Sequence, residues 1–429
     1  MRPSLLPGPR KTLCASVAVP PSKSLTNRAM IMAAAAGGGS VLSPLDCEDT
    51  RLLAEALAAA GWSVDWHDVI DIGERRVPDH RIVVELGNSG TGARLLLSLL
   101  AAVPGCFVVD GSPRLRERPL APLLDCLVAL GAELRSADGR LPVEIDGMVL
   151  GGGKVWLRPE VSSQFVSSLV LAAPLMTRGM ELEVVGPLPS APYLDLTEDV
   201  LRAFGARVKV GPKRRLWQVS HGLTAGTRYR VEGDWSAAAF AVAAQGVAGG
   251  EVDVGPLDRH SRQGDRVVCE ILAPSGVRYR QEGDRLLLRG SAGRAFSADL
   301  SDAPDLFPAL AVVAAAAPAG SVFSGLDHLK HKESDRLDVM VENLRRLGAR
   351  VSVDGSRLHI ASPMRREHLE PPEVTAAGDH RIAMAMAVAA LAVGPLHLDD
   401  ASCVAKSFPG FWSMWDGLVA EGGWGRHDP

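Results

Sequence analysis

The sequence is poor in aromatic residues and in lysine, and it has no long apolar run. Phe, Trp and Tyr make up 5% of the 429 residues, and only eight of the 46 basic residues are lysine. The net charge is −4 and the pI is near 6.3, which argues against a nucleic-acid coat protein or a basic membrane-surface protein. The longest apolar run, Ile382–Val393, is too short to span a bilayer. The N-terminus lacks the charged-then-apolar pattern of a secretion signal, so we expect a cytoplasmic protein.

Cysteine pairs and cofactor motifs are missing as well. The six cysteines are widely scattered and form no CxxC pair, so a disulfide framework or a zinc site is not expected. We expect each cysteine to be a small buried apolar side chain. The sequence also has no HExxH motif, no GxxxxGK(S/T) phosphate loop and no GxGxxG motif after a strand. We therefore expect no metal, no nucleotide and no other cofactor.

What the sequence does contain is an internal repeat. An amphipathic helix pattern, a glycine and a strand pattern recur, with the glycines at positions 61, 131, 205, 276 and 348 and a weaker copy at 422. In one copy Leu337, Met340, Leu344 and Leu347 keep helical spacing before Gly348, which would supply the left-handed turn that ends the helix. These helices have a polar face and should cover the outside of the protein.

A second recurring piece is a polar opening followed by an Ala-, Leu- and Val-rich helix that is apolar all round and should be buried. Its six openings are Ser22-Lys23-Ser24, Asn88-Ser89-Gly90-Thr91, Ser162-Ser163-Gln164, Asp234-Trp235-Ser236, Asp302-Ala303-Pro304-Asp305 and Gly378-Asp379-His380-Arg381. Six such units are too many for one hydrophobic core, so we expect an α/β (α+β) fold with two domains of three units each. One domain should comprise residues 20–231, and the other should comprise residues 1–19 together with residues 232–429. A Gly-, Pro- and base-rich loop, Gly211–Gly226, should precede the boundary. The segment before Pro20 should return to the second domain as a strand.

The polar openings are rich in cations. Lys23, Ser24 and Arg28 lie at one helix start, where free N–H groups and the helix dipole already favour an anion. If all six helix starts face one gap between the domains, their cations would bind one or two multiply charged anionic substrates. Two acids, Asp305 and Glu333, are embedded among these cations. A carboxylate there stays ionised and can act as a general base, but spacing alone also allows Asp305 to be an ordinary helix N-cap.

Together these motifs resemble the EPSP synthase family (3-phosphoshikimate 1-carboxyvinyltransferases), which are enolpyruvyl transferases. The matching segments run in order from Pro20 to Pro409: SKSLTNR, GNSGTGARLL, RERPLAPLL, SSQFVSSLVLAAP, SAPYLD, DLFPALAVVAA, KESDRL, GDHRIAMAMAVAAL and AKSFPGF. The resemblance implies two domains, each of three βαβαββ units with buried parallel helices, an inside-out α/β barrel. It implies transfer of the enolpyruvyl group of phosphoenolpyruvate to the 5-hydroxyl of shikimate 3-phosphate, with release of phosphate, in the synthesis of chorismate and aromatic amino acids. A monomer without metal or cofactor is expected.

The resemblance also implies a role for each matching residue. The groups expected to hold shikimate 3-phosphate are Lys23, Ser24, Arg28, Ser162, Ser163, Gln164, Ser190 and Tyr193. The groups expected to bind phosphoenolpyruvate, or to shape its loop, are Lys23, Asn88, Gly90, Thr91, Arg118, Arg336, Arg381 and Lys406. Asp305 is the expected base for the 5-hydroxyl, with Lys332 near the same group. Glu333 is the expected proton donor to the methylene carbon, with His380 close by. His328 stands where the family usually has an asparagine that contacts substrate.

Three alternatives account for part of these patterns. The enolpyruvyl transferase that acts on UDP-N-acetylglucosamine has a similar fold but carries a reactive cysteine in the loop of its second unit, and Asp110–Pro119 contains none. An RNA-end-processing cyclase is built from similar units, but the acidic pI and the lack of a basic-aromatic surface count against nucleic acid. A non-catalytic binding protein could keep the anion sites, although retention of Asp305, Glu333 and Lys23 together argues against it.

Overall fold

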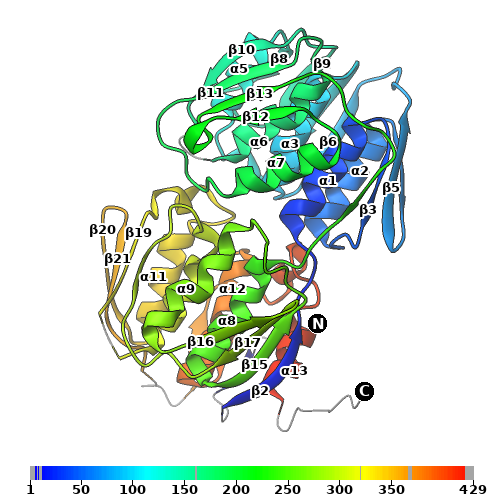
Figure 1. Cartoon of the computed structure of the whole chain (residues 1–429). Coiled ribbons are helices and arrows are strands. Elements are labelled where there is room, and N and C mark those ends of the chain that lie inside the picture. Colours follow the sequence, from blue (N-terminus) through cyan, green and yellow to red (C-terminus); the bar gives the residue numbers. More distant parts are fainter. Residues whose placement is uncertain are drawn as a thin grey trace, which may run out of the picture. The chain divides into compact units, whose positions relative to one another are not determined.

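The computed structural model describes residues 5–6, 8, 12–159, 162–318, 320–365 and 370–420, and it shows a mixed α/β protein (Figure 1). Contacts within the chain divide it into two compact lobes. Lobe 1 comprises Met1–Pro20 and Glu232–Pro429, and lobe 2 comprises Pro21–Val231. The two lobes are described separately below.

Lobe 2 alternates strands with helices along the chain. Its strands are β3 (Gly39–Leu42), β4 (Trp62–Trp66), β5 (Val69–Arg75), β6 (Ile82–Glu85), β7 (Gly105–Asp110), β8 (Glu133–Ser136), β9 (Val143–Gly147), β10 (Gly153–Leu157), β11 (Met180–Val184), β12 (Val208–Val210), β13 (Leu216–Val219) and β14 (Thr227–Arg230). Its helices are α1 (Lys23–Ala35), α2 (Glu48–Ala59), α3 (Gly90–Ala101), α4 (Pro113–Arg116), α5 (Ala121–Ala129), α6 (Gln164–Ala172) and α7 (Tyr193–Ala203), with 3-10 turns η1 (Ala173–Leu175) and η2 (Pro212–Arg214). The described strands form sheets of order β14-β3-β5-β4, β6-β7-β9-β8 and β10-β11-β13-β12.

The helices α1, α3 and α6 are buried on nearly all sides, as the sequence predicts. Most of their side chains are apolar, and these lie on every face of each helix, so no face suits water. Ile31, Leu96 and Leu169, one from each helix, are fully buried, and the three helices contact one another. They share one apolar cluster with the inner faces of the three sheets. Burying an aliphatic side chain of this size stabilises the fold by roughly 1.5–3 kcal/mol.

Lobe 1 follows the same plan. Its strands are β1 (Leu5–Leu6), β2 (Leu13–Ala18), β15 (Gly250–Gly255), β16 (Arg278–Glu282), β17 (Arg285–Arg289), β18 (Ser297–Asp299), β19 (Ser321–Ser324), β20 (Arg350–Asp354), β21 (Arg357–Ser362), β22 (Glu373–Val374) and β23 (Leu396–Leu398). Its helices are α8 (Trp235–Ala248), α9 (Val268–Leu272), α10 (Phe307–Ala316), α11 (Arg336–Arg346), α12 (His380–Val393) and α13 (Phe411–Val419), with 3-10 turns η3 (Gly264–Val267), η4 (Ala273–Ser275), η5 (Pro304–Leu306), η6 (Asp327–His331) and η7 (Ser402–Lys406). The described strands form sheets of order β16-β17-β15-β2, β18-β19-β21-β20 and β1-β23-β22.

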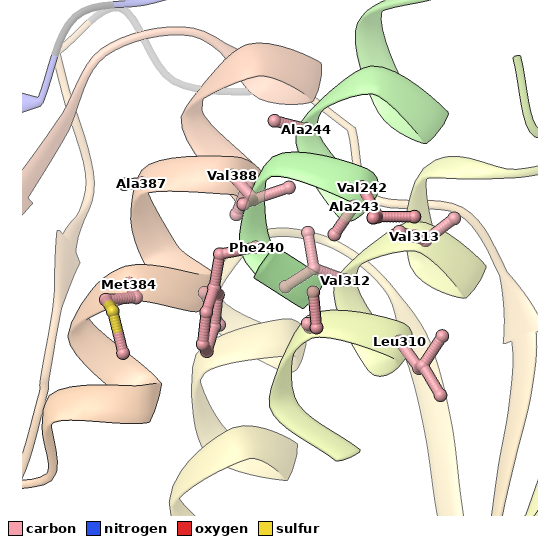
Figure 2. Close-up of a cluster of buried hydrophobic side chains, with 14 of the residues drawn as sticks. Phe240, Val242, Ala243, Ala244, Leu310, Val312, Val313, Met384, Ala387 and Val388 are labelled. Carbon is pink, nitrogen blue, oxygen red and sulfur yellow. The ribbon is translucent and has the colours of Figure 1, made fainter. Parts of the chain in front are cut away.

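The core of lobe 1 is built around α8, α10 and α12. Figure 2 shows side chains from all three helices meeting in one apolar cluster, with Phe240 from α8, Val312 from α10 and Val388 from α12 among them. All three side chains are fully buried. Alanine is frequent in these helices, and its small side chain lets neighbouring helix axes approach closely. No helix within the described ranges combines the length and apolarity needed to cross a membrane.

The chain passes between the lobes in two segments, and each segment is flanked by a strand that joins a sheet far along the chain. β2 pairs in parallel with β15, so the segment before Pro20 is a strand of lobe 1, as predicted. β14 pairs in parallel with β3, which places the last strand of lobe 2 beside its first. β2 and β14 are each the edge strand of a four-stranded sheet.

The repeated glycines end their helices as predicted. Gly61, Gly131, Gly205, Gly276 and Gly348 all have positive φ, between 79° and 118°. At Gly61 an added Cβ would lie 1.9 Å from the Arg76 carbonyl oxygen, so that turn requires glycine for space as well as for backbone conformation. The weaker copy at Gly422 lies outside the described residues.

Two sequence-based expectations are wrong. The first is that every cysteine is buried: Cys14 and Cys106 are exposed, and Cys403 is half-buried. Cys14 on β2 and Cys106 on β7 are exposed because they lie on the solvent side of their strands. The predicted loop Gly211–Gly226 contains the strand β13, which pairs with both β11 and β12. The strand pattern of Leu216–Val219 is only four residues long, and the surrounding Gly, Pro and basic residues are typical of a loop, so the sequence predicted a loop.

Candidate active site

In lobe 2 the first predicted anion site lies at the start of α1. Lys23 is the first residue of the helix, and its Nζ lies 2.8 Å from Oδ2 of Asp49 in the first turn of α2. Asp49 is 2% exposed, and the Lys23 side chain is 12% exposed. Ser22, the N-cap residue, makes no side-chain hydrogen bond to the helix end. Lys23 is therefore held by a buried acid at the start of α1. The Ser22 side chain caps none of the free backbone N–H groups there.

Arg28 lies one turn further along α1 and is 1% exposed. Its Nε donates to Thr197 Oγ1 at 2.9 Å, and its Nη2 donates to Ser167 Oγ at 3.3 Å. Its Nη1 donates to the Ser24 carbonyl oxygen at 2.9 Å. Burial lowers the pKa of the Arg28 guanidinium to about 10, with Tyr193 and Tyr229 acting in the opposite direction. Arg28 thus joins α1, α6 and α7 in this structure, and its expected contact with substrate stays a prediction.

The second opening places Gly90 against Arg118. Gly90 is the first residue of α3, and Arg118 follows α4 and is 5% exposed. A Cβ built on Gly90 would lie 2.2 Å from Nη1 of Arg118 and 2.6 Å from its Cζ. No larger residue fits at position 90 unless the guanidinium moves. The neighbouring cations Arg114 and Arg116 instead form exposed ion pairs with Glu117 and Asp110.

The third opening is tied to the second by a chain of hydrogen bonds. Gln164 Nε2 donates to Thr91 Oγ1 at 2.9 Å, and Arg94 Nη1 donates to Gln164 Oε1 at 2.6 Å. These bonds fix the Gln164 amide between α3 and α6. Ser162 Oγ accepts from the Gln164 N–H at 3.2 Å, and Ser163 Oγ donates to the Ser190 carbonyl oxygen at 3.0 Å.

The remaining predicted residues of lobe 2 lie beside these groups in the chain. Ser190 is 8% exposed and has a positive φ of 57°, and Tyr193 is the first residue of α7. Ser89, between Asn88 and Gly90, is the N-cap of α3 and makes no side-chain hydrogen bond to the helix. The predicted residues of this lobe therefore gather at the starts of α1, α3, α6 and α7.

In lobe 1 the predicted residues converge on Arg336, the first residue of α11. Its side chain is fully buried. Nη1 donates to Asp305 Oδ1 at 2.9 Å, Nη2 to Glu333 Oε2 at 2.7 Å, and Nε to Asp379 Oδ2 at 2.9 Å. Burial acts to lower the pKa of Arg336, but Asp379, Glu333 and Asp305 outweigh it and raise that pKa above its usual value. Each end of the guanidinium is therefore satisfied by an acid.

Asp305 has three cationic partners on three different elements. Arg381 Nη2, from the first turn of α12, lies 2.9 Å from Asp305 Oδ2, and Lys332 Nζ lies 3.4 Å from Oδ1. The third partner is Arg336. Asp305 itself lies in η5, and the N-cap of the following helix α10 is Leu306, which makes no side-chain cap. The helix-cap alternative for Asp305 is therefore wrong.

Asp379 and His380 lie at the start of α12. Asp379 is the N-cap: its Oδ1 accepts from the Arg381 N–H at 2.9 Å, and Ser334 Oγ donates to its Oδ2 at 3.2 Å. The His380 side chain is 1% exposed, with Nδ1 3.8 Å from Asp379 Oδ1. Asp379 is therefore one acid beside His380, and the Glu333 carboxylate lies 2.7 Å from Arg336 Nη2.

His328 and Lys406 complete the predicted set in lobe 1. His328 is 8% exposed, and its Nε2 has no hydrogen-bond partner among the described residues. Burial, Lys332 and Arg336 lower the pKa of His328 to about 3, with Asp305 acting in the opposite direction, so its imidazole is neutral at physiological pH. Lys406 is 4% exposed at the end of η7, a turn that contacts α12.

One surface cavity of lobe 2 lies away from the predicted residues. It has a volume of about 420 Å³ and lies between α5 and β10, lined by apolar residues such as Pro122, Cys126 and Trp156, and it contains none of the predicted site residues. Its lining carries no cluster of cations, so it does not suit a multiply charged anion. Within the described ranges, no group of three or more His, Cys, Asp or Glu side chains could hold a metal ion.

Comparison with known proteins decides the family. A family model for EPSP synthase (3-phosphoshikimate 1-carboxyvinyltransferase) matches residues 8–415. The chain belongs to the EPSP synthase family. A 3-phosphoshikimate 1-carboxyvinyltransferase of Methanosphaerula palustris is 39% identical over 421 residues, which cover 94% of this chain and 96% of the relative. Another, of Methanocorpusculum labreanum, is 39% identical over 418 residues, covering 96% and 98%.

Solved structures of EPSP synthases agree with this assignment. The EPSP synthase of Acinetobacter baumannii superposes with a TM-score of 0.76 at 28% identity, covering 96% of this chain and 98% of that one. The enolpyruvyl transferase NikO of Streptomyces tendae has a TM-score of 0.75 at 20% identity, covering 97% of each chain, which supports the shared fold alone.

Sequence reasoning missed several residues that hold the site of this EPSP synthase family member. Asp49 binds Lys23, Asp379 binds Arg336, and Arg94 orients Gln164. Arg94 could have been found, because it is a lone charge in an otherwise apolar helix. Asp49 and Asp379 could not, since an acid in the first turn or at the N-cap of a helix is ordinary capping chemistry.

Proposed function

We propose that the protein transfers the enolpyruvyl group of phosphoenolpyruvate to the 5-hydroxyl of shikimate 3-phosphate and releases phosphate, with Asp305 as the general base. Membership of the EPSP synthase family makes the protein a 3-phosphoshikimate 1-carboxyvinyltransferase of aromatic amino acid biosynthesis. The observation that carries the residue assignment is the position of Asp305, a single carboxylate contacted by Arg381, Lys332 and Arg336. Such an acid stays ionised, and anionic substrates are attracted by the same cations.

The reaction moves the proton of the 5-hydroxyl to the departing phosphate, and it adds one proton to the methylene carbon and later removes one. Asp305 accepts the proton of the 5-hydroxyl while that oxygen bonds to the central carbon of phosphoenolpyruvate. Glu333 gives a proton to the methylene carbon, which becomes a methyl group, and a tetrahedral ketal phosphate forms. Glu333 then takes back one methyl proton while the bond from carbon to the phosphate oxygen breaks, and the departing phosphate takes up the proton held by Asp305, which gives the enol ether. Anions that engage Lys332 and Arg381 would draw these cations from Asp305 and make it a better proton acceptor.

We assign the two substrates to different sets of residues. The starts of α1 and α3 carry N-cap serines without side-chain caps, so their N–H groups suit a phosphate, together with Lys23. In contrast, the starts of α8 and α12 are capped by Asp234 and Asp379, so lobe 1 offers side-chain cations instead. We assign the shikimate phosphate to Ser162, Ser163 and Ser190, with Lys23, Ser24 and Arg28, and the ring to Gln164 and Tyr193. We assign phosphoenolpyruvate to Gly90, Arg118, Arg336, Arg381 and Lys406.

The finer architecture is part of the same proposal. Each sheet with its two helices forms one βαβαββ repeat, and three repeats around buried parallel helices make an inside-out barrel in each lobe. Among the described residues, lobe 2 has three four-stranded sheets, and lobe 1 has two four-stranded sheets and one three-stranded sheet. These sheets support the arrangement, as does the packing of α1, α3 and α6 and of α8, α10 and α12. We also propose a cytoplasmic monomer that requires neither nucleic acid nor a membrane.

Phosphate release tests the activity directly. The purified protein should release phosphate from phosphoenolpyruvate in the presence of shikimate 3-phosphate and only at background rate without it. Replacement of shikimate 3-phosphate by UDP-N-acetylglucosamine should give background release. Turnover with the nucleotide sugar alone would overturn the acceptor, and no turnover with either acceptor would favour a non-catalytic anion-binding protein.

A further inference from the structure

The cavity between α5 and β10 in lobe 2 takes no part in the function proposed above. Its volume is about 420 Å³, and none of the residues assigned to the two substrates lines it. Ligand pockets of proteins usually measure about 300–1,000 Å³, so this cavity has room for one small molecule.

One wall of the cavity is a face of the helix α5. It is formed at helical spacing by Pro122, Asp125, Cys126 and Ala129. Pro119, two residues before the helix, extends this wall. The wall is apolar except at Asp125, an exposed carboxylate that forms no hydrogen bond or ion pair with any described residue.

The opposite wall is the outer edge of the strand β10, which is an edge strand and is bonded in its sheet to β11. The Leu157 carbonyl oxygen accepts from the Val185 N–H at the end of β11, at 2.9 Å. Neighbouring residues of a strand direct their backbone groups to opposite edges, so the N–H and C=O of Trp156 point away from β11. Cys126 Sγ of α5 donates to this C=O at 3.4 Å, which places α5 on that side.

Two side chains of the strand wall are available to a ligand. The Trp156 side chain is 67% exposed, although tryptophan is mostly buried in folded proteins. Arg158, directly after β10, is exposed and forms no hydrogen bond or ion pair within the described ranges. The cavity therefore combines an apolar lining with one carboxylate, Asp125, on the helix wall and one guanidinium, Arg158, on the strand wall.

We propose that this cavity binds a free amino acid with an aromatic side chain, at a site separate from that of the two substrates. The aromatic ring lies on the indole of Trp156 and against Pro119 and Pro122, where it covers apolar surface. The carboxylate of the ligand pairs with Arg158, whose guanidinium can donate two parallel hydrogen bonds, and its ammonium group pairs with Asp125. A wholly apolar ligand would leave both charges without a partner, and a polyanion would be repelled by Asp125.

Isothermal titration calorimetry of the full-length protein with L-phenylalanine tests the proposal. The probe should bind at one site with a dissociation constant of roughly 1 mM or below. 3-Phenylpropionate lacks the ammonium group and L-phenylalaninamide lacks the carboxylate, so each should bind at least about threefold more weakly. Saturating shikimate 3-phosphate should leave the binding of L-phenylalanine intact. Displacement of the probe by shikimate 3-phosphate would place it in the substrate site and overturn the inference.

Three variants assign the contacts, and all three side chains are exposed, so the fold should be kept. Arg158→Gln should weaken L-phenylalanine and 3-phenylpropionate at least about threefold but leave L-phenylalaninamide unchanged, because the amide has no carboxylate to lose. Asp125→Asn should weaken L-phenylalanine but not 3-phenylpropionate, which has no ammonium group. Trp156→Ala should weaken all three probes.

Arg228→Gln is the matched control, because it alters an exposed arginine of β14 that does not line the cavity, and it should bind L-phenylalanine as the unmodified protein does. Unchanged affinity for L-phenylalanine in Arg158→Gln and Trp156→Ala would overturn the inference. Absence of saturable binding to the unmodified protein below about 10 mM would do the same. The inference is independent of the proposed function, since its readout is binding and no substrate has to turn over.

Discussion

The guanidinium of Arg381 lies 2.9 Å from the carboxylate of Asp305, and this pair connects the start of α12 with the turn before α10. Asp305 is 15% exposed and Arg381 is 10% exposed, so the contact is mostly shielded from water. An ion pair of this kind keeps its acid ionised. The cation can then turn to an anionic substrate. This relationship underlies the first prediction.

Asp305→Asn should reduce turnover by about 100-fold or more, because the amide keeps the shape of the carboxylate but cannot take the hydroxyl proton. Binding of shikimate 3-phosphate, measured by calorimetry, should remain detectable, since the groups proposed to hold its phosphate and its ring are in lobe 2. Asp253→Asn is the matched control, because Asp253 also pairs with an arginine, at 2.8 Å from Arg285, but outside the Arg336 network. Near-normal turnover of Asp305→Asn would remove Asp305 from the role of base.

Gly90→Ala should raise KM for phosphoenolpyruvate by roughly tenfold, with a much smaller change in KM for shikimate 3-phosphate. The new methyl group would lie 2.2 Å from Nη1 of Arg118, and the flexible arginine side chain, rather than the helix, should move. Gly151→Ala is the control, because its Cβ would meet another arginine, Arg178, at an ordinary 3.4 Å. Steady-state kinetics with each substrate varied in turn measure both effects. Equal increases for the two substrates would contradict the assignment of Arg118 to phosphoenolpyruvate.

Arg336→Gln should destabilise lobe 1 by about 3–5 kcal/mol, because it leaves the buried acid Asp379 without its charged partner. The Arg336 and Asp379 side chains are both fully buried. Adding Asp379→Asn removes the stranded charge while keeping an oxygen that can cap α12, so the double variant should recover part of the loss. Urea unfolding followed by circular dichroism gives the free energies of unfolding of the unmodified protein, Arg336→Gln, Asp379→Asn and the double variant. A double variant as unstable as the sum of the single variants would show that the two residues are not coupled.

The stability of the protein should depend on His328 below pH 6.5. Its pKa is about 3 in the folded state, so between pH 3 and 6.5 the unfolded chain binds more protons there than the folded protein does. The free energy of unfolding therefore falls as pH decreases, by about 1–2 kcal/mol between pH 6.5 and pH 5 from this group. His328→Asn should remove that part of the decrease. Urea unfolding at the two pH values, compared between the two proteins, isolates the contribution, and equal pH dependence in both would refute it.

The sequence by itself determined which helices are buried in each lobe and where several helices end. Helices such as α1 and α12 were predictable because a helix that is apolar all round can only be buried, and the turns at Gly61 and Gly348 were predictable because positive φ favours glycine. These properties depend on residues a few positions apart. The exposed Cys14 and Cys106 were not predictable in the same way, because the face of a strand is set by the sheet that it joins.

The partners of the charged residues were decided by the tertiary structure alone. The motifs indicated Lys23, Asp305 and Arg336, but pairing with Asp49, Arg381 and Asp379 depends on elements that are distant in the chain. Electrostatic attraction has no periodicity in sequence and falls with distance in space, so only the packed fold fixes which acid meets which base.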